Sequence, residues 1–459
     1  MTKYIKENIN LTFITSLVFS FIPVSFIFGN LITNLTFVIF CLLGAYQLKS
    51  KILKIKLNFA FKIIFLLFLI VLFSTSINFF KSVYLNEFQQ DDLTRLIKAI
   101  VFMRFFLFLI ITYLLCEFNF LKLKYFFITS ALFPIFISID IFYQSMFGFN
   151  IIGIESMNSR INSSFFGEEF IAGGYIKNFA FFSILLIPFI FKNKKNIQYI
   201  LIIISISILG AGIILSGNRM PLPQFIFGLF LLIWFIPKLR KTISLSIVVF
   251  LLVFTLIYKN NNDVRKNYRS FYGAIKNISE KVFKNSNKAK STSNNESENK
   301  FSIKKYEFFG GLKITAPQTI HGHSKIFATA IDTWSLNKIY GNGIKSFRKD
   351  CIIFSKNKIN RICSNHPHNY YFEILTETGL IGLLTVIILG IIFIAFIFKN
   401  HKIFKENLIL LAAIVSLILE TFPIKSTGSI FTTNNATYLI LLTSIVISYK
   451  KMLLNNSFK

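Results

Sequence analysis

Long, uninterrupted apolar blocks are the feature that most constrains how this sequence can fold. Two of them read IIFLLFLIVLF from Ile63 and LLTVIILGIIFIAFIF from Leu383. A helix that crosses a membrane needs about 20 mostly apolar residues. The sequence is 54% hydrophobic and only 15% charged, whereas a soluble domain is about 25% charged. These features exclude a soluble enzyme, a disordered chain and a secreted disulfide-rich domain, and they predict an all-α polytopic membrane protein.

About twelve stretches have the length and composition of transmembrane helices. They lie at approximately 9–29, 31–48, 57–78, 98–116, 124–145, 171–191, 197–215, 221–237, 241–258, 371–398, 405–423 and 430–449. Every second short loop is rich in Lys, and the positive-inside rule places such loops in the cytoplasm. Lys3 and Lys6 at the start and Lys450 and Lys451 at the end fall on that side. Both termini are therefore predicted to be cytoplasmic, and the first span, which no cleavage site follows, is interpreted as an uncleaved helix.

One connection is far longer than the others and divides the chain into three parts. We expect nine spans in residues 1–258, a large loop on the outer side of the membrane in residues 259–370 and three spans in residues 371–459. Within the loop, residues 285–300 are of low complexity and are predicted to be disordered. The loop is rich in Lys and Arg, but long loops are translocated regardless of their charge. The net charge of +30 is therefore interpreted through membrane topology, and no nucleic-acid partner is expected.

Two of the four cysteines, Cys351 and Cys363, fall in this loop. Because an outer compartment is oxidising, a disulfide between them is predicted, with two free thiols as the alternative. The bridge would hold residues 352–362 as a hairpin-like excursion before the histidines. A zinc site is disfavoured because no CxxC motif accompanies the pair. Cys41 and Cys116 lie inside predicted spans and are expected to be core residues.

Charged residues inside transmembrane segments are rare and are functional hypotheses by default. The predicted topology puts all five of them in the outer part of their spans: Arg104, Asp140, Glu373, Glu377 and Glu420. For any one residue the alternative is a snorkelling side chain or an ion pair at the interface. A transporter would place its charges near the midplane and repeat them between its two halves. The one-sided set instead indicates a reaction or binding site at the outer membrane–water boundary.

Two outer motifs carry arginines. The segment RINSSFFGEEFIAGG begins at Arg160 and combines a cation, two carboxylates and three glycines, although it is also what a loop turning into a span would look like. The segment SGNR ends at Arg219 at the outer end of the seventh span. A guanidinium at that depth suits bidentate binding of phosphate or pyrophosphate, and a structural ion pair is the alternative. The segment GNGIKSFR is interpreted as a turn that places Arg348, with no nucleotide role.

Four of the five histidines lie in the large loop: His321, His323, His366 and His368. The last two belong to the motif HPHN, which leads directly into the tenth span. Histidine can act as a general base near neutral pH. A metal site is the weaker interpretation, because HxH spacing alone is a poor signal and no carboxylate ligand lies beside it.

The motif HPHNYYFEILTETGLIGLL resembles the signature of the O-antigen ligase and O-antigen polymerase (Wzy-type) superfamily. RINSSFFGEE, LSGNR, GHSKIFATAIDTW and YGNGIKSFR resemble further segments of that family in the same order, so the resemblance covers roughly residues 160–438. It implies a GT-C-like, metal-independent glycosyltransferase of the bacterial inner membrane that uses no cofactor. Such an enzyme transfers a glycan from undecaprenyl pyrophosphate on the periplasmic side of the lipid bilayer. A ligase passes the glycan to lipid A core, and a polymerase passes it to another lipid-linked repeat unit.

The resemblance also assigns roles to individual residues. His368 would be the general base, Arg219 would hold the pyrophosphate leaving group, and Arg160 would be a second cation. Many members have an arginine where this chain has His323, so either His323 or Lys325 would supply that charge. Arg348, Asn369 and Glu373 are the remaining substrate-binding candidates. We favour a ligase, with a polymerase as the alternative and a lipid-linked oligosaccharide transporter as the alternative of another class.

Overall fold

The structure is a computed structural model of the 459-residue chain. It describes residues 2–54, 57–156, 162–167, 171–273, 305–307, 313–315, 322–356, 358, 360–404 and 406–454. The segment 285–300, for which disorder is predicted, lies outside the described residues.

Helices make up nearly all of the described structure. The helices before the large loop are α1 (Thr2–Ser25), α2 (Asn30–Leu48), α3 (Phe59–Tyr84), α4 (Gln90–Phe102), α5 (Arg104–Glu117), α6 (Leu123–Phe147), α7 (Ala172–Ile190), α8 (Lys195–Leu215), α9 (Pro221–Phe235) and α10 (Arg240–Asn260). The later elements are the paired antiparallel strands β1 (Lys305–Glu307) and β2 (Lys313–Thr315), and the helices α12 (Gly322–Trp334), α13 (Phe347–Ser355), α14 (Tyr370–Phe404), α15 (Leu408–Glu420) and α16 (Thr433–Leu454).

The predicted fold class, an all-α polytopic membrane protein, is confirmed. A helix occupies each of the twelve predicted spans, and among the described residues nine helical segments are long and apolar enough to cross a membrane. The fourth span begins earlier than predicted, because Gln90 starts α4 eight residues before the apolar run. Its start is stabilised by Asp92, whose carboxylate accepts a hydrogen bond from the backbone N–H of Gln89 (3.0 Å). A break at Met103 then separates α4 from α5.

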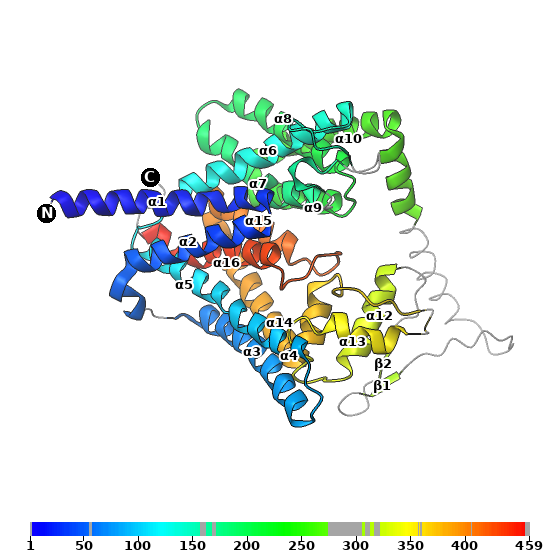
Figure 1. The fold of residues 1–459 in the computed structure, drawn as a ribbon. Coiled ribbons are helices and arrows are strands. Elements are labelled where there is room, and N and C mark those ends of the chain that lie inside the picture. Colours follow the sequence, from blue (N-terminus) through cyan, green and yellow to red (C-terminus); the bar gives the residue numbers. More distant parts are fainter. Residues whose placement is uncertain are drawn as a thin grey trace.

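The helices form two groups that are joined by the last part of the chain (Figure 1). In the first group α6 packs against α1, α7 and α8, and α8 packs against α10. In the second group α3 packs against α4 and α14, while α2 packs against α5. The helices α15 and α16 connect the groups, since α15 contacts α7 and α16 contacts α5. The helices α12 and α13 lie at one end of the bundle, which we call the large-loop side, and α1 begins at the opposite end.

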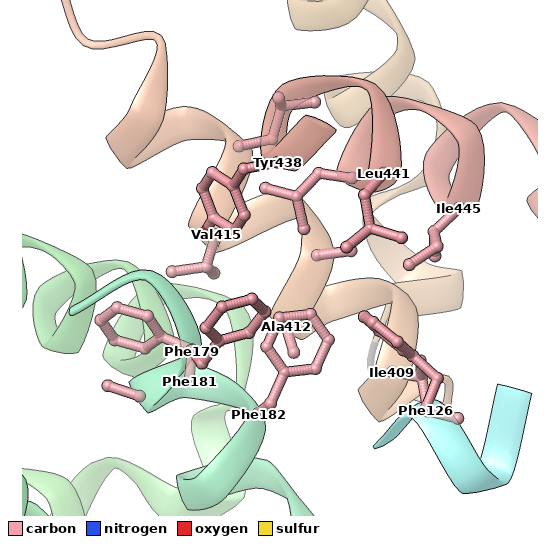
Figure 2. Packing of buried hydrophobic residues seen from close by; sticks show 14 of the residues in the cluster. Phe126, Phe179, Phe181, Phe182, Ile409, Ala412, Val415, Tyr438, Leu441 and Ile445 are labelled. Atoms are coloured by element: carbon pink, nitrogen blue, oxygen red, sulfur yellow. The ribbon is translucent and has the colours of Figure 1, made fainter. Parts of the chain in front are cut away.

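The interior between the groups is built almost entirely from aliphatic and aromatic side chains (Figure 2). Phe179, Phe181 and Phe182 of α7 are fully or almost fully buried; Phe181 packs against Phe225 of α9, and Phe182 packs against Phe126 of α6. The ring of Phe179 lies 5.4 Å from that of Tyr438 in an edge-on arrangement, which aromatic pairs favour. Helix α15 is buried along nearly its whole length, so its apolar residues face protein more than lipid.

The tenth span is interrupted where the sequence reads TGL. Gly379 has a φ of 68° inside α14, and a Cβ atom there would lie 2.2 Å from the carbonyl oxygen of Ile339. Only glycine fits such a position, because it tolerates positive φ and a close approach of another backbone. The turn at Gly341–Gly343 fills this break, with the backbone N–H of Gly343 donating to the carbonyl of Glu377 (2.9 Å). The GNG motif therefore anchors the large loop to α14.

The structure joins Cys351 and Cys363 in a disulfide. The hairpin-like excursion expected between them is wrong for its first half, because α13 continues helically through Ser355. The following segment is held to α12 by an ion pair between Arg361 Nε and the buried Asp332 Oδ2 (2.7 Å). The disulfide and this ion pair together fasten the chain just before the histidine motif.

Candidate functional site

Three histidines lie together at the start of α14 on the large-loop side. The ring centroids of His366 and His368 are 4.1 Å apart, and those of His323 and His368 are 5.2 Å apart. The hydroxyl of Ser364 lies 3.2 Å from Nε2 of His368 and can donate to that nitrogen when it is unprotonated. The structure thus brings together residues of α12 and of the HPHN segment, whereas His321 lies outside the described residues.

The loop between α15 and α16, residues 421–432, holds the histidine segment through its backbone. The N–H of Thr427 donates to the carbonyl of His368 (2.8 Å), and the carbonyl of Thr427 lies 3.2 Å from Nε2 of His366. His368 has a φ of 56°, a left-handed conformation that costs a residue with a side chain about 1–2 kcal/mol. The contacts from the α15–α16 loop stabilise this conformation and so set the direction of the imidazole.

The environment keeps these imidazoles neutral. Burial lowers the pKa of His368 to about 4, and the neighbouring His366 and His323 act in the same direction. Burial also lowers the pKa of His366; the backbone of Thr427 opposes this shift, and the guanidinium of Arg348 adds to it. A neutral imidazole can accept a proton, so both rings are available as bases at neutral pH.

Asn369 and Glu373 connect α14 to the α15–α16 loop. The side-chain oxygen of Asn369 accepts a hydrogen bond from the N–H of Tyr371 (2.9 Å), which caps the first turn of α14. Its side-chain nitrogen donates to two backbone carbonyls of the α15–α16 loop, at 2.8 and 3.3 Å. The carboxylate of Glu373 accepts from the N–H of Ile430 (2.8 Å). Both side chains are buried, so in this structure they hold the histidine segment in place.

The basic candidates on the large-loop side lie around the histidine cluster. Arg348 is exposed in the first turn of α13, close enough to His366 and Lys345 to affect the pKa of each. Burial lowers the pKa of Lys345, and Arg348 lowers it further. Lys325 lies on α12 two residues beyond His323 and is half-buried. The structure therefore places Arg348 and Lys325 on the two helices that flank the histidines.

Arg219 lies on the turn that precedes α9. Its Nε donates to Oδ1 of Asn267 (2.6 Å), and Nδ2 of Asn267 donates to the carbonyl of Gly217 (2.8 Å). Asn267 thus fixes both the turn and the orientation of the guanidinium. Asn267 could not be singled out from the sequence, because it is one of many asparagines in a polar loop.

The α15–α16 loop also contacts the helix that follows Arg219. The ring of Phe422 lies 5.3 Å from that of Phe227 on α9. The same loop therefore contacts both the histidine segment and α9. Arg160 lies outside the described residues, so the structure does not place it.

Two of the charged residues predicted inside spans have contacts within the fold. The carboxylate of Asp140 accepts hydrogen bonds from the hydroxyl of Ser164 and from the N–H of Ile151, and so orders the chain after α6. Arg104 donates to the side-chain oxygen of Asn34 (2.8 Å) and lies over the ring of Phe105. These contacts match the structural interpretation of each residue.

Glu420 belongs to a buried cluster that the sequence only partly revealed. Its Oε2 lies 2.9 Å from Nζ of Lys177 and 3.0 Å from Nζ of Lys425, and its Oε1 accepts a hydrogen bond from the hydroxyl of Tyr370 (2.6 Å). Lys177 was missed because it lies one turn inside an apolar helix that looked ordinary. The available signal was a lysine at the outer end of a span, where the positive-inside rule disfavours it.

The arrangement combines a neutral imidazole with cations on the elements around it. Such a site can remove a proton from an incoming hydroxyl and stabilise negative charge that develops on a leaving group. Among the described residues, no group of three His, Cys, Asp or Glu side chains is arranged to hold a metal ion. The fold and the site define a polytopic membrane protein with a polar, histidine-containing site at one end of its bundle.

Comparison with known families supplies the more specific class. Residues 201–387 match the family model described as O-Antigen ligase. The match supports the predicted resemblance to the O-antigen ligase superfamily, and the matched region contains Arg219, His323, Arg348 and His368. No curated protein matches the sequence. The match supports an O-antigen ligase or polymerase type of function without separating the two.

Proposed function

We propose that the protein is an O-antigen ligase that transfers a glycan from undecaprenyl pyrophosphate to lipid A core. The reaction would take place on the periplasmic face of the bacterial inner membrane, with both termini in the cytoplasm. The observation that carries this proposal is His368, a half-buried imidazole with a lowered pKa, held in a left-handed conformation within the matched family region. A base fixed in this way at the end of a membrane bundle suits a reaction between two lipid-anchored substrates.

In the proposed reaction His368 takes the proton of the acceptor hydroxyl as its oxygen attacks the anomeric carbon of the donor sugar. The bond between that carbon and the pyrophosphate oxygen breaks, and the electron pair leaves with undecaprenyl pyrophosphate. His368 afterwards releases its proton to water. A base with a pKa of about 4 is weaker than the optimum near the working pH, but an anionic donor bound beside the imidazole would raise its pKa.

The leaving group requires fixed positive charge, because negative charge grows on the pyrophosphate in the transition state. We assign this role to Arg219, whose guanidinium is oriented by Asn267. Arg160 is the proposed second cation. His323, Lys325 and Arg348 surround the base and are proposed to contact the substrates. Asn369 and Glu373 act by positioning, because their side chains are hydrogen-bonded within the protein.

No metal or cofactor takes part in the proposed mechanism. The proposal also keeps the predicted division of the chain into helices up to residue 258, a periplasmic loop over 259–370 and helices from 371. With this topology the whole site would lie on one side of the bilayer. The polymerase alternative would use the same residues with a second lipid-linked glycan as acceptor. A lipid-linked oligosaccharide transporter would need charges near the midplane, whereas the histidine cluster contacts α12 on the large-loop side.

The test of this proposal is the lipopolysaccharide of a strain that lacks the gene, compared on a gel with that of the complemented strain. A ligase predicts lipid A core without O-antigen and long glycans that accumulate on undecaprenyl pyrophosphate. Core capped with a single repeat unit would instead identify a polymerase. An unchanged ladder would contradict both activities.

Arg219 can be tested separately from the base. Arg219→Ala should reduce transfer about 10²- to 10³-fold, the usual effect of removing one group that stabilises transition-state charge. Arg219→Lys keeps the charge but loses the planar fork, so it should restore only part of the activity. Equal activity of the wild type and Arg219→Ala in membranes with equal protein would contradict the assignment.

A further inference from the structure

The cluster around Glu420 contains more positive than negative charge and is closed to solvent. Its side chains expose only 5% (Lys177), 7% (Glu420) and 4% (Lys425) of their surface. Both ammonium groups contact the same carboxylate oxygen, and Lys425 also lies over the ring of Tyr370 (5.3 Å). Burial lowers the pKa of Lys425 to about 8, with Glu420 acting in the opposite direction. The cluster is therefore a structural unit that no substrate reaches in this structure.

Two members of this cluster, Glu420 and Lys425, are directly connected to the segment that carries His368. Tyr370 follows His368 by two residues, and its hydroxyl donates to Glu420. Lys425 precedes Thr427 by two residues, and its carbonyl accepts a hydrogen bond from Asn369 (3.3 Å). The hydroxyl of Tyr371 donates to the carbonyl of Thr421, the residue after Glu420. Two segments, 366–371 and 420–427, are thus fastened together at several points along their length.

Lys177 adds a third element to this assembly. It comes from α7, and its bond to Glu420 (2.9 Å) fixes the end of α15 against α7. The carbonyl of the next residue, Asn178, accepts hydrogen bonds from the hydroxyls of Ser416 on α15 (3.1 Å) and Tyr438 on α16 (2.7 Å). The position of Glu420 is therefore set by the apolar bundle, while its remaining contacts extend into the histidine segment.

We propose that Lys177, Glu420 and Lys425 form a buried ionic latch that positions His368 for catalysis. The inference rests on the proposed function, because it assumes that His368 is the base. Lys177, Glu420 and Lys425 lie outside the region matched by the family model, residues 201–387. The latch acts through Tyr370 and the α15–α16 loop, so its members are positioning residues and touch neither substrate.

The latch explains why charged groups are retained in so apolar a setting. A buried ion pair contributes little net stability, but the loss of one partner leaves an uncompensated charge and is strongly destabilising. Glu420→Gln leaves two buried ammonium groups facing each other without a carboxylate between them. The double variant Lys177→Met/Glu420→Gln leaves a single buried cation, which is the net charge of the wild-type cluster.

The experiment compares five proteins in proteoliposomes: wild type, His368→Ala, Glu420→Gln, Lys177→Met/Glu420→Gln and the control Asp140→Asn. Asp140 is also a buried carboxylate, but it orders the chain after α6. The readouts are kcat and KM for each substrate, the pH dependence of kcat/KM between pH 5 and 8, and the thermal midpoint. Asp140→Asn should lower the thermal midpoint without changing the pH dependence.

Glu420→Gln should lower kcat by about 10²-fold, the effect of a misplaced catalytic group, with KM changed much less. Two groups lower the pKa of His368: His366 on the same segment and His323 on α12. Arg348 on α13 lowers the pKa of His366. In the variant the loosened imidazole gains solvent, so its pKa rises from about 4 toward about 6.5. Activity then falls between pH 7 and pH 5.5, where the wild type keeps it. The double variant should recover much of kcat.

The outcomes separate the latch from the function on which it rests. Equal transfer by the wild type and His368→Ala would overturn the proposed function. A requirement for His368 together with an unchanged kcat and pH dependence in Glu420→Gln would overturn the latch alone. The latch is also overturned if the folded fraction of Glu420→Gln is fully active, since the cluster would then serve stability only.

Discussion

The apolar interior around α7 and α15 and the polar segment around His368 are built on opposite principles. In the first region, side chains such as Phe179 and Phe182 pack by shape and burial alone. In the second, nearly every side chain or carbonyl has a hydrogen-bond partner. For example, the N–H of Thr427 donates to the carbonyl of His368, and the N–H of Ile430 donates to the carboxylate of Glu373. Apolar packing tolerates substitutions of similar volume, whereas a buried polar group that loses its partner costs its full desolvation. The first region should therefore govern stability, and the second should govern chemistry.

The largest effect is expected at the histidine. His368→Ala should reduce glycan transfer by about 10²- to 10⁴-fold, the usual contribution of a general base, and should leave the helical bundle folded. His401→Ala is the matched control, because His401 is exposed at the far end of α14. Transfer assays at equal protein level, with circular dichroism of both proteins, provide the measurement. An equal loss of activity in His368→Ala and His401→Ala would contradict the special role given to His368.

A substitution in the apolar interior should have the opposite effect, lowering stability and leaving the chemistry unchanged. Phe182→Ala should destabilise the protein by about 3–5 kcal/mol, because it removes a fully buried ring from a packed core. The transfer rate per folded molecule should stay near that of the wild type. Thermal unfolding followed by fluorescence or circular dichroism measures the first quantity, and activity normalised to folded protein measures the second. A selective loss of activity without a loss of stability would break the comparison.

Substitution at the contact between α14 and the GNG turn should have an effect of intermediate size. Gly379→Ala should destabilise the protein by about 1–3 kcal/mol, because alanine is strained at positive φ and its Cβ would meet the carbonyl of Ile339. Gly390→Ala is the control in the same helix, since a Cβ there meets nothing within 4 Å. The two thermal midpoints give the test. Equal midpoints would show that the break in α14 is dispensable.

The smallest effect concerns the pH dependence of the base. His368 must be neutral to accept a proton, so kcat/KM, which reports the free enzyme, should persist as the pH falls and should decline only as the pH approaches about 4. His323→Gln removes one of the groups that lower this pKa, and the acid limb of kcat/KM should then shift by a few tenths of a pH unit toward neutral. Rate measurements from pH 4.5 to 8 follow the shift. A movement toward lower pH would contradict the electrostatic role given to His323.

The sequence predicted the helices well because burial in lipid leaves a strong, local signal. It also singled out Glu420 by its unusual place inside a transmembrane segment. It did not reveal Lys177 as its partner, because that contact joins residues more than 240 positions apart. The breaks at Met103 and Gly379 escaped for a related reason, since each depends on what packs against the helix. The roles of Asn369 and Glu373 required knowledge of the α15–α16 loop, whose carbonyls and N–H groups carry no sequence signal.

The most direct test of the central claim is transfer by the purified protein in proteoliposomes. The reaction would contain an undecaprenyl-pyrophosphate-linked O-antigen glycan, lipid A core and a chelator of divalent metals, with the product resolved on a gel. The proposal predicts glycan-capped lipid A core from the wild type and none from His368→Ala. Equal product from the two proteins, or no product from a folded wild type with both substrates present, would contradict it.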